Sequence, residues 1–313
     1  MISCIIPCYG SEGTIAGVVD ELKSTFLDRG VSDFEVILVN DASPDGLFDV
    51  IRQLCLDHDF VRGIDLSRNF GQHNAIMAGL SRAQGDICVF LDDDGQTPGS
   101  EVWKLIDALD DTCDVVFAKY TSKQHSFLRN LGSRMNSLMA ELLVSKPTHL
   151  YFSSYVACKR YIAEELLRYD GSDTYLSGLL IRASNRVKNV VVEHREREVG
   201  KSGYTTKRLL SLWLNGFTAF SVKPLRLASL MGFLVASVGF VYGVYILIKK
   251  LFIAPYVPLG WSSTMAVILF MCGIIMIMLG MIGEYLGRVY IKLNHSPQYV
   301  IREEIGFLEE RGS

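Results

Sequence analysis

The chain has 313 residues, enough for one large or two modest domains, and its formal net charge of −3 argues against a nucleic-acid-binding surface. Its mean hydropathy of +0.24 is high for a soluble enzyme, and the excess lies in two long apolar segments. The seven cysteines have no CxxC spacing, which argues against zinc sites or disulfides and indicates buried thiols in a reducing compartment.

Residues 1 to about 120 alternate between strand-like and helix-like segments. The strand-like runs are 2–6, 34–39, 61–66, 87–91 and 115–118, and the helix-compatible segments lie near 12–28, 46–57, 72–83 and 99–110. A βαβ succession of this kind predicts a mostly parallel sheet with helices on both faces. From residue 121 to about 204 the periodicity is weaker, and helices are expected near 126–143 and 160–168.

An acidic cluster, Asp92-Asp93-Asp94, follows the apolar run 87–91 directly. It therefore lies at the carboxyl end of a predicted buried strand, where open α/β sheets bind their ligands. Asp92 and Asp94 alternate with Asp93, so this pair can face the same way and hold a divalent cation that itself carries a diphosphate. The alternative interpretation is an acidic turn that caps the next helix.

Three further polar loops, 7–12, 39–45 and 67–72, also follow predicted strands. A polar loop after a strand is an ordinary structural outcome. Four such loops at the carboxyl ends of parallel strands all lie on one edge of the sheet, however, and together they favour a ligand-binding site there. In the second of them, Asp41 is a candidate acceptor for a nucleotide base.

The segments 227–248 and 264–283 contain no charged residue, and each is about long enough to cross a bilayer as a helix. They predict a hairpin of two spans, with two very apolar core helices as the alternative. More Lys and Arg residues lie outside the two segments than in the loop between them. By the positive-inside rule, this distribution predicts that both termini are cytoplasmic. Before the hairpin, 205–226 mixes aromatic and basic residues, as in a helix at the membrane interface or one packed on the soluble domain. Residues 294–313 form a short polar cytoplasmic tail in this interpretation.

Several motifs are similar to those of a known family. They are Ser67-Arg68-Asn69-Phe70-Gly71, the Asp-x-Asp-x-Gln pattern of Asp92, Asp94 and Gln96, Arg197-x-x-Gly200-Lys201-Ser202-x-Tyr204, and Gly283-Glu284-Tyr285-Leu286-Gly287-Arg288. With them the chain resembles the family 2 glycosyltransferases of the GT-A fold, and more closely the polyprenyl-phosphate glycosyltransferases, such as dolichyl-phosphate mannose synthase and bactoprenol glucosyltransferases. The resemblance covers nearly the whole chain. It implies an α/β, Rossmann-like nucleotide-sugar-binding domain over 1–204 and a membrane hairpin within 227–293.

The resemblance also implies roles for individual residues. The donor-binding set is Pro7, Tyr9, Glu12, Asp41, Arg68, Gly71 and Asp93. The set for Mg²⁺ or Mn²⁺ is Asp92, Asp94 and Gln96. The set for the acceptor phosphate is Lys123, Arg129, Ser133, Lys201 and Ser202, although the basic stretch around Arg129 is also compatible with a solvated helix near anionic lipid. The catalytic set is Asp92, Asp94 and Arg197. Family members with this hairpin can self-associate, so a homo-oligomer is a further expectation.

The chain departs from the family pattern at three places. Gly10-Ser11 stands where Asn-Glu is usual, Asp94-Gly95-Gln96 where Asp-Leu-Gln is common, and Ser153-Ser154-Tyr155-Val156 where Asp-Phe-Arg-Leu is frequent. The last change touches the sugar and acceptor region, so the identity of the sugar does not follow from the resemblance.

The expected reaction is inverting transfer of a hexose from a nucleotide sugar to polyprenyl (undecaprenyl) phosphate at the cytoplasmic face of the plasma membrane. UDP-glucose is the donor expected first. A phosphate monoester has a second pKa of about 6, so it can attack without a strong protein base. GDP-mannose, a UDP-N-acetylhexosamine or a modified aminosugar are the alternative donors. A processive polysaccharide synthase is a rival, although the chain lacks the Gln-x-x-Arg-Trp motif, and a non-catalytic membrane scaffold is another, although Asp92 and Asp94 are intact.

Overall fold

The computed structural model describes residues 1–120, 150–171, 174–193, 195, 260–293 and 297–307, with 234, 237, 241, 245 and 248. The chain divides into two units, one made of residues 1–141, 145–203 and 296–313 and the other of 142–144 and 204–295. Each unit is described by itself.

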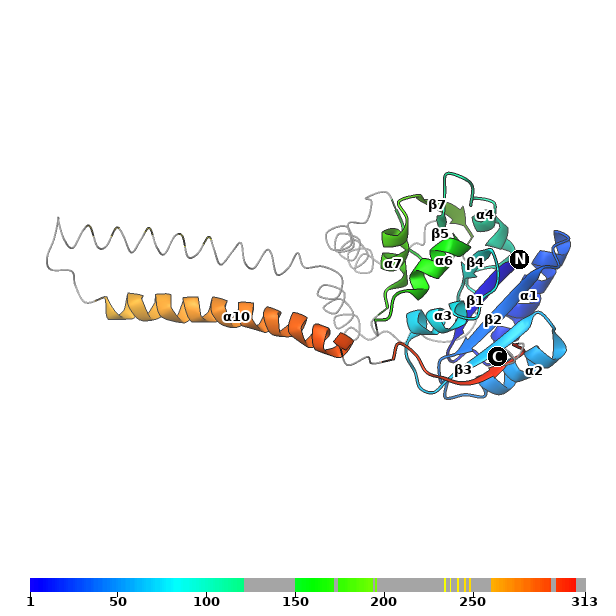
Figure 1. Ribbon diagram of the computed structural model, residues 1–313, viewed down its shortest axis with the longest axis horizontal. Helices are drawn as coiled ribbons and strands as arrows, with labels where there is room; N and C mark the ends of the chain where they lie inside the picture. The colour runs from blue at the N-terminus through cyan, green and yellow to red at the C-terminus, as the bar shows by residue number, and fades with distance from the viewer. Residues whose placement is uncertain are drawn as a thin grey trace, which may run out of the picture. The chain divides into compact units, whose positions relative to one another are not determined.

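The first unit is built on one eight-stranded sheet of order β7-β5-β6-β4-β1-β2-β3-β8 (Figure 1). The strands are β1 Ile2–Cys8, β2 Phe34–Asn40, β3 Val61–Leu66, β4 Ile87–Phe90, β5 Val115–Tyr120, β6 Val156–Lys159, β7 Val187–Val192 and β8 Ile301–Ile305. The strand β1 pairs in parallel with β2 on one side and with β4 on the other. The chain order therefore reverses direction between β1 and β4, and this reversal is the switch point at which open α/β sheets bind ligands.

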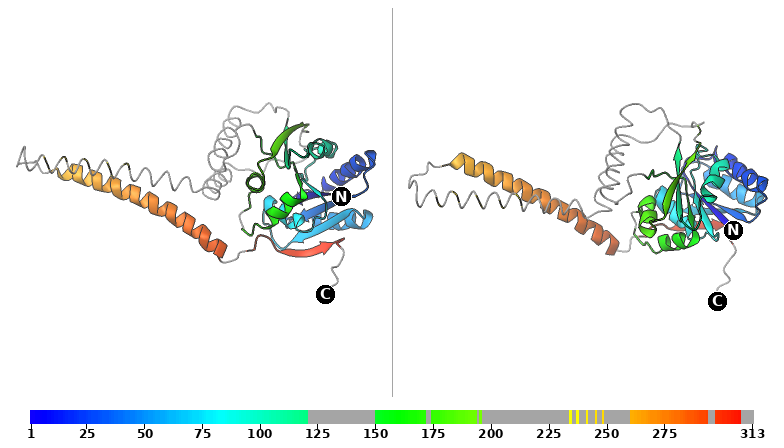
Figure 2. Two further views of the ribbon diagram at one scale, coloured as in Figure 1. Left: turned by 45° about the horizontal axis from the view of Figure 1, so that its top comes forward. Right: turned by 90° about the horizontal axis from the view of Figure 1, so that it is seen from above.

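Helices cover both faces of the sheet, as the two views of Figure 2 show. Their bounds are α1 Ile15–Asp28, α2 Leu47–Asp57, α3 Gln72–Leu80, α4 Val102–Ile106 with a preceding 3₁₀ turn Gly99–Glu101, α6 Arg160–Leu167 and α7 Leu176–Ala183. The apolar side chains of α1, α2 and α4 pack into one core layer, and those of α3, α6 and α7 pack into the other. The mostly parallel α/β sheet predicted from the sequence is confirmed.

The first strands were predictable because each is rich in apolar residues. All seven residues of β1 and all seven of β2 are buried, as expected for strands with helices on both faces. Three strands were not predicted: β6 has four residues, β7 is half-exposed, and β8 reads Ile-Arg-Glu-Glu-Ile. The helix expected over 99–110 is a 3₁₀ turn followed by the five residues of α4.

The strand β8 lies in the segment that the sequence had assigned to a separate polar tail, 294–313. The structure instead adds Ile301–Ile305 to the sheet, antiparallel to β3. Its central residues are exposed, which is why the sequence lacks the apolar signal of a strand. The sheet thus takes its edge strand from the far end of the chain.

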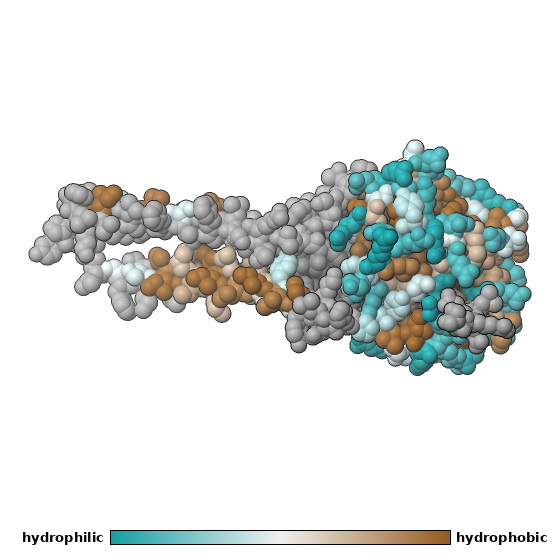
Figure 3. Space-filling model, in the orientation of Figure 1, coloured by the Kyte–Doolittle hydropathy of each residue, from teal (hydrophilic) through white to brown (hydrophobic). Residues whose placement is uncertain are grey.

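The second unit contains α10, Trp261–Leu293, a helix of 33 residues. The described side chains of this helix are largely apolar and exposed, and they appear brown along its length in Figure 3. Its stretch Phe270–Gly287 is long and apolar enough to cross a membrane by length and composition. This helix includes the predicted segment 264–283, whereas the partner segment 227–248 and the interfacial segment 205–226 lie almost entirely outside the described residues. The membrane hairpin stays a prediction.

The contact between α3 and β1 allows a test of the packing. A Cβ atom added to Gly79 of α3 lies 2.6 Å from Ile5 Cγ2 and 3.0 Å from Val39 Cγ2. We expect Gly79→Ala to lower the free energy of unfolding by about 1–3 kcal/mol, because the sheet must shift to admit the methyl group.

Gly17→Ala in α1 is the matched control. Its added Cβ meets no atom within 4 Å, so the better helix former is expected to leave stability unchanged or to raise it by up to about 1 kcal/mol. Denaturant unfolding of the full-length protein in detergent measures both; an equal effect of the two changes contradicts the packing argument.

Candidate active site

Hydrogen bonds join the loops that follow β1, β2 and β4. The Tyr9 backbone N–H donates to Asp93 Oδ2 at 2.9 Å, which connects β1 to the acidic cluster across the switch point. The Gly10 N–H donates to Ser43 Oγ at 2.8 Å, which connects β1 to the loop after β2. The convergence of these loops, expected from the parallel sheet, is therefore present in the contacts.

Asp41 holds the loop after β3. Its carboxylate oxygens accept from the backbone N–H groups of Phe70 at 2.7 Å and Gly71 at 2.8 Å, and its carbonyl accepts from the Asn69 amide at 3.2 Å. Burial raises the pKa of Asp41, and these two backbone donors oppose the shift. Asp41, which was predicted to accept a hydrogen bond from a nucleotide base, thus also holds the backbone of the loop after β3. The loop that it fixes also carries Arg68, whose guanidinium lies 4.6 Å from the centre of the Phe70 ring.

Asp92 is oriented by two side chains from other elements. Its Oδ1 accepts from Gln72 Nε2 at 2.8 Å, at the start of α3, and its Oδ2 accepts from Ser154 Oγ at 2.5 Å, just before β6. Burial, together with the charges of Asp94 and Asp93, raises the pKa of Asp92 to about 6, although the hydrogen bonds from Ser154 and Gln72 oppose the shift. Near neutral pH the group is mostly ionised and firmly held.

The acidic cluster fits a divalent cation only in part. Asp93 is turned to the β1 loop, and its pKa is raised by burial. Asp94 accepts from the Gln96 N–H at 3.1 Å, in a turn in which Gly95 has φ +69°. Within the described residues no three His, Cys, Asp or Glu side chains gather as a complete metal cage. Two carboxylates, Asp92 and Asp94, do suit Mg²⁺ or Mn²⁺ delivered with a diphosphate, because such sites take one or two carboxylates and fill the remaining positions with phosphate oxygens and water.

The other predicted donor-binding residues differ in exposure. Tyr9 is 55% exposed at the rim of the site, whereas Pro7 is a buried residue within β1. Glu12 is exposed and accepts from the Gly46 N–H at 3.0 Å, at the start of α2. Tyr9 is therefore available to a ligand, and Pro7 contributes through the strand.

Several predicted residues lie outside the described residues. They are Lys123, Arg129, Ser133, Arg197, Lys201 and Ser202. The described residue nearest to Arg197 in the chain is Arg195, whose N–H donates to the Gln96 carbonyl at 3.0 Å. The Arg195 guanidinium forms a two-pronged ion pair with Glu21 of α1, at 2.9 and 3.0 Å. These contacts fix Arg195 beside the acidic cluster.

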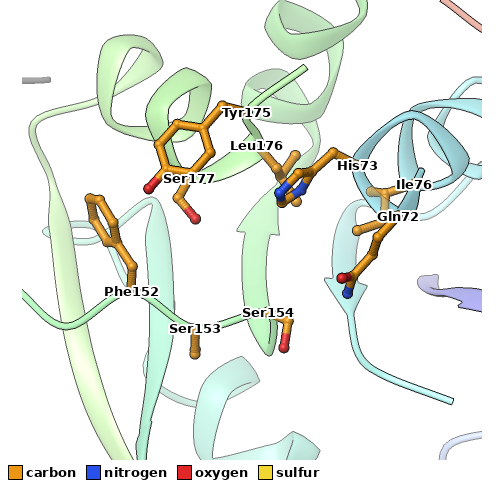
Figure 4. Close-up of a pocket in the computed structure, with 9 residues that line it drawn as sticks. All are labelled: Gln72, His73, Ile76, Phe152, Ser153, Ser154, Tyr175, Leu176 and Ser177. Atoms are coloured by element: carbon orange, nitrogen blue, oxygen red, sulfur yellow. The ribbon is translucent and has the colours of Figure 1, made fainter. Parts of the chain in front are cut away.

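A pocket of about 220 Å³ opens next to Asp92 (Figure 4). Its lining comes from α3, from the segment before β6 and from the start of α7, and it consists of Gln72, His73, Ile76, Phe152, Ser153, Ser154, Tyr175, Leu176 and Ser177. The His73 ring extends from α3 toward α7 and meets the Tyr175 ring edge-on at 6.0 Å between centroids. Its Nδ1 is buried without a hydrogen-bond partner among the described residues. The sequence pointed to this pocket only through the unusual Ser153-Ser154 pair.

The family model for glycosyl transferase family 2 matches residues 3–167, which carry the first six strands and the acidic cluster. The chain belongs to glycosyl transferase family 2. A second model, the GtrB C-terminal hairpin, matches residues 223–289. The family predicted by resemblance is thereby confirmed, and the chain is a glycosyltransferase.

Curated relatives align over nearly the entire chain. The undecaprenyl-phosphate 4-deoxy-4-formamido-L-arabinose transferases of Yersinia pestis (strain Pestoides F) and Yersinia pseudotuberculosis (serotype I, strain IP32953) are each 32% identical over 308 residues, 97% of this chain and 94% of the relative. Among solved structures, glucosyl-3-phosphoglycerate synthase from Mycobacterium tuberculosis in complex with UDP is 18% identical, with a TM-score of 0.53 over 70% of this chain and 78% of that chain. This likeness shows the GT-A fold.

The buried His73 predicts a pH dependence of stability. Burial lowers its pKa from 6.5 to about 4, so between these values the unfolded chain binds a proton that the folded chain does not. The His73 contribution is present above pH 6.5 and is lost as the pH falls toward 4, by at most ~3 kcal/mol. We expect His73→Gln to flatten the pH dependence of urea unfolding between pH 7 and 4.5 in this glycosyltransferase. His58→Gln, at a partly buried ring whose Nε2 lies 4.0 Å from Asp20 Oδ1, is the control that retains the pH dependence. Equal slopes for wild type and His73→Gln would contradict the assignment.

Proposed function

We propose that this glycosyltransferase moves a sugar from a nucleoside diphosphate sugar to a polyprenyl phosphate, with undecaprenyl phosphate as the acceptor lipid. The observation that carries the proposal is the joined set of strand-end loops at the switch point between β1 and β4. The set occurs in a chain that aligns over 97% of its length with undecaprenyl-phosphate transferases. A shared acceptor lipid follows more readily from such full-length similarity than a shared sugar does.

The donor is best described as a UDP-sugar. The name of the relatives favours a formamido-substituted aminopentose, so an aminosugar ranks at least equal to the UDP-glucose expected from the sequence. The pocket beside Asp92 is the proposed place for the transferred sugar. None of its lining residues is an Asp, Glu, Lys or Arg, which suits a sugar ring better than a phosphate.

A divalent cation is part of the proposed site. Solved proteins of the same fold include a complex with Mn²⁺ and UDP. In this chain Asp92 and Asp94 would hold the ion, with Gln96 beside them. When bound, the cation would neutralise the diphosphate leaving group.

The chain's own residues supply position and charge. Gln72 and Ser154 hold the Asp92 carboxylate in one orientation, so it need not reorganise during the reaction. The acceptor phosphate is largely dianionic at neutral pH and needs no strong base. One of its oxygens forms a bond to the anomeric carbon while the bond to the diphosphate oxygen breaks, and the nucleoside diphosphate leaves. In-line displacement inverts the anomeric centre. Arg197 and Lys201 are proposed to bind the two anionic groups.

Membrane attachment completes the proposal. The acceptor's polyprenyl chain is embedded in the bilayer, and a catalytic domain tethered by a hairpin of spans meets its phosphate without extracting the lipid. The helix α10 and the match of residues 223–289 to a C-terminal hairpin support such a tether. We propose that both termini are cytoplasmic and that the enzyme is a multi-pass protein of the plasma membrane.

The reaction is tested by transfer from a panel of labelled nucleotide sugars to undecaprenyl phosphate. The panel includes UDP-glucose, GDP-mannose, a UDP-N-acetylhexosamine and a UDP-linked formamido-aminopentose. We expect one UDP-sugar to give an organic-extractable product that is lost on chelation of divalent metal, with NMR showing the anomeric configuration inverted. No product from any donor, with folded protein, would favour a membrane scaffold over an enzyme.

Asp94→Ala should lower the rate of transfer by a factor on the order of 100 or more, as removal of a charge-stabilising group does in other active sites. The protein should stay folded and membrane-bound. Asp111→Ala is the matched control, since Asp111 is an exposed carboxylate elsewhere on the domain. Initial rates with the preferred donor, beside thermal unfolding of each variant, measure the difference. Wild-type rates in Asp94→Ala would refute the role of the acidic cluster.

A further inference from the structure

The last described strand of the chain, β8, joins the catalytic sheet beside β3, the strand whose following loop carries Arg68 and Gly71. It lies along β3 in Figures 1 and 2, with Gly63 paired to Ile305 and Leu66 paired to Ile301. The Ser67 N–H also donates to the Val300 carbonyl at 2.9 Å, just beyond the strand. Because α10 precedes β8 in the chain, the sheet is completed only by residues that follow the long apolar helix.

Arg302 of β8 reaches a fully buried carboxylate. Asp65 of β3 has 0% exposure, and its Oδ2 accepts from Arg302 Nε at 2.6 Å, with a second contact to the same guanidinium. A buried carboxylate is strongly destabilising unless it is paired and hydrogen-bonded. Among the described residues, the basic side chain that forms an ion pair with Asp65 is that of Arg302.

The second oxygen of Asp65 leads to the donor-binding loops. Asp65 Oδ1 accepts from Asn40 Nδ2 at 2.8 Å, and Asn40 Oδ1 accepts from the Ser43 N–H at 3.1 Å. Ser43 Oγ in turn accepts from the Gly10 N–H at 2.8 Å. Each partner in this series fixes the orientation of the next, because the Asn40 amide must donate toward Asp65 and accept from Ser43.

The loop after β2 requires such support. Ala42 has φ +51°, a left-handed conformation that is rare for residues with a side chain. Its neighbour Asp41 holds the Phe70–Gly71 backbone, so a shift of this loop would move two of the strand-end loops together. Local strain of this kind persists only where surrounding contacts hold the backbone in place.

We propose that Arg302 is a positioning residue for the donor nucleotide, acting through Asp65 and Asn40 on the loop that carries Asp41. The inference rests on the proposed use of this loop for the nucleotide. It implies that donor affinity depends on residues that follow the membrane-associated segment. A chain cut after α10 would thus lose part of its donor site as well as an edge strand.

Two other ion pairs of β8 provide a control that distinguishes the positioning role of Arg302 from attachment of the strand to the domain. Glu303 pairs with Arg52 of α2 at 3.0 Å, and Glu304 pairs with Arg82 at 2.8 Å, both between partly exposed side chains. Surface pairs of this kind contribute little to stability and do not lead to Asn40. Glu303→Gln therefore alters the same strand, next to Arg302, without touching the series from Asp65 to Ser43.

The test uses the full-length protein in detergent, with UDP and Mg²⁺ as the probe. We expect Arg302→Met to weaken UDP binding about tenfold and to raise the donor KM by a similar factor, with the KM for undecaprenyl phosphate unchanged and kcat changed less. Arg302→Lys should recover much of the affinity, and Glu303→Gln should match wild type. Unchanged UDP affinity in folded Arg302→Met, even with a lower Tm, would overturn the inference.

A double variant keeps the test decisive if Arg302→Met folds poorly. Asp65→Asn removes the buried charge, so adding Arg302→Met to it should weaken UDP binding far less than about tenfold, since the two residues act through one contact. A full additive loss would show that Arg302 does not act through Asp65, and would overturn the inference. Failure of wild-type protein to bind UDP would instead refute the proposed function, which separates the two failures.

Discussion

The site depends on the parallel pairing of β1 with both β2 and β4. Parallel strands bring their carboxyl ends to one edge of a sheet, and the reversal of chain order at β1 leaves the loops on its two sides free to diverge. Tyr9 and Gly10, consecutive residues after β1, donate to opposite sides of this gap, one to Asp93 and the other to Ser43. The positions of Asp41 and of the acidic cluster follow from this frame, because the loops that carry them begin at β2 and β4.

Carboxylates hold the frame together. Asp93 accepts from the β1 loop, Asp41 from the β3 loop, and Asp65 from Asn40 and Arg302, so several acidic residues act on backbone position before any ligand is present. Hydrogen bonds to a charged acceptor contribute about 1.5–3 kcal/mol each, and a buried acceptor left without its donors is destabilising by a similar amount. A loop held by several such bonds has few alternative positions of similar energy. The edge that carries the candidate site is therefore largely preformed.

The sequence predicts the parts of this protein that have a local signal. Runs rich in apolar residues identified the first five strands, and polar residues directly after the first four of them pointed to the edge where the candidate site lies. The short β6 and the polar β8 give no such signal, because their strand conformation depends on pairing with strands that are distant in the chain. For the same reason, the orientation of Asp92 by Gln72 and Ser154 and the pairing of Asp65 with Arg302 could not be read from the sequence. Asp41 and Asp93 lie at this edge, but their contacts to neighbouring loops required the fold, and their role in donor binding stays a prediction.

The acidic cluster shows how adjacent residues of one type take different tasks. Asp93 is turned to the β1 loop, Asp92 accepts from Gln72 and Ser154, and Asp94 accepts from the Gln96 N–H in the turn that follows. Burial, with a smaller contribution from the charges of Asp94 and Asp93, raises the pKa of Asp92 to about 6, which makes its charge a source of instability in the protein alone. A cation that arrives with its diphosphate would relieve this repulsion. The unfavourable charge density at these carboxylates and the proposed role of Asp92 and Asp94 in holding a divalent cation are then two consequences of one arrangement.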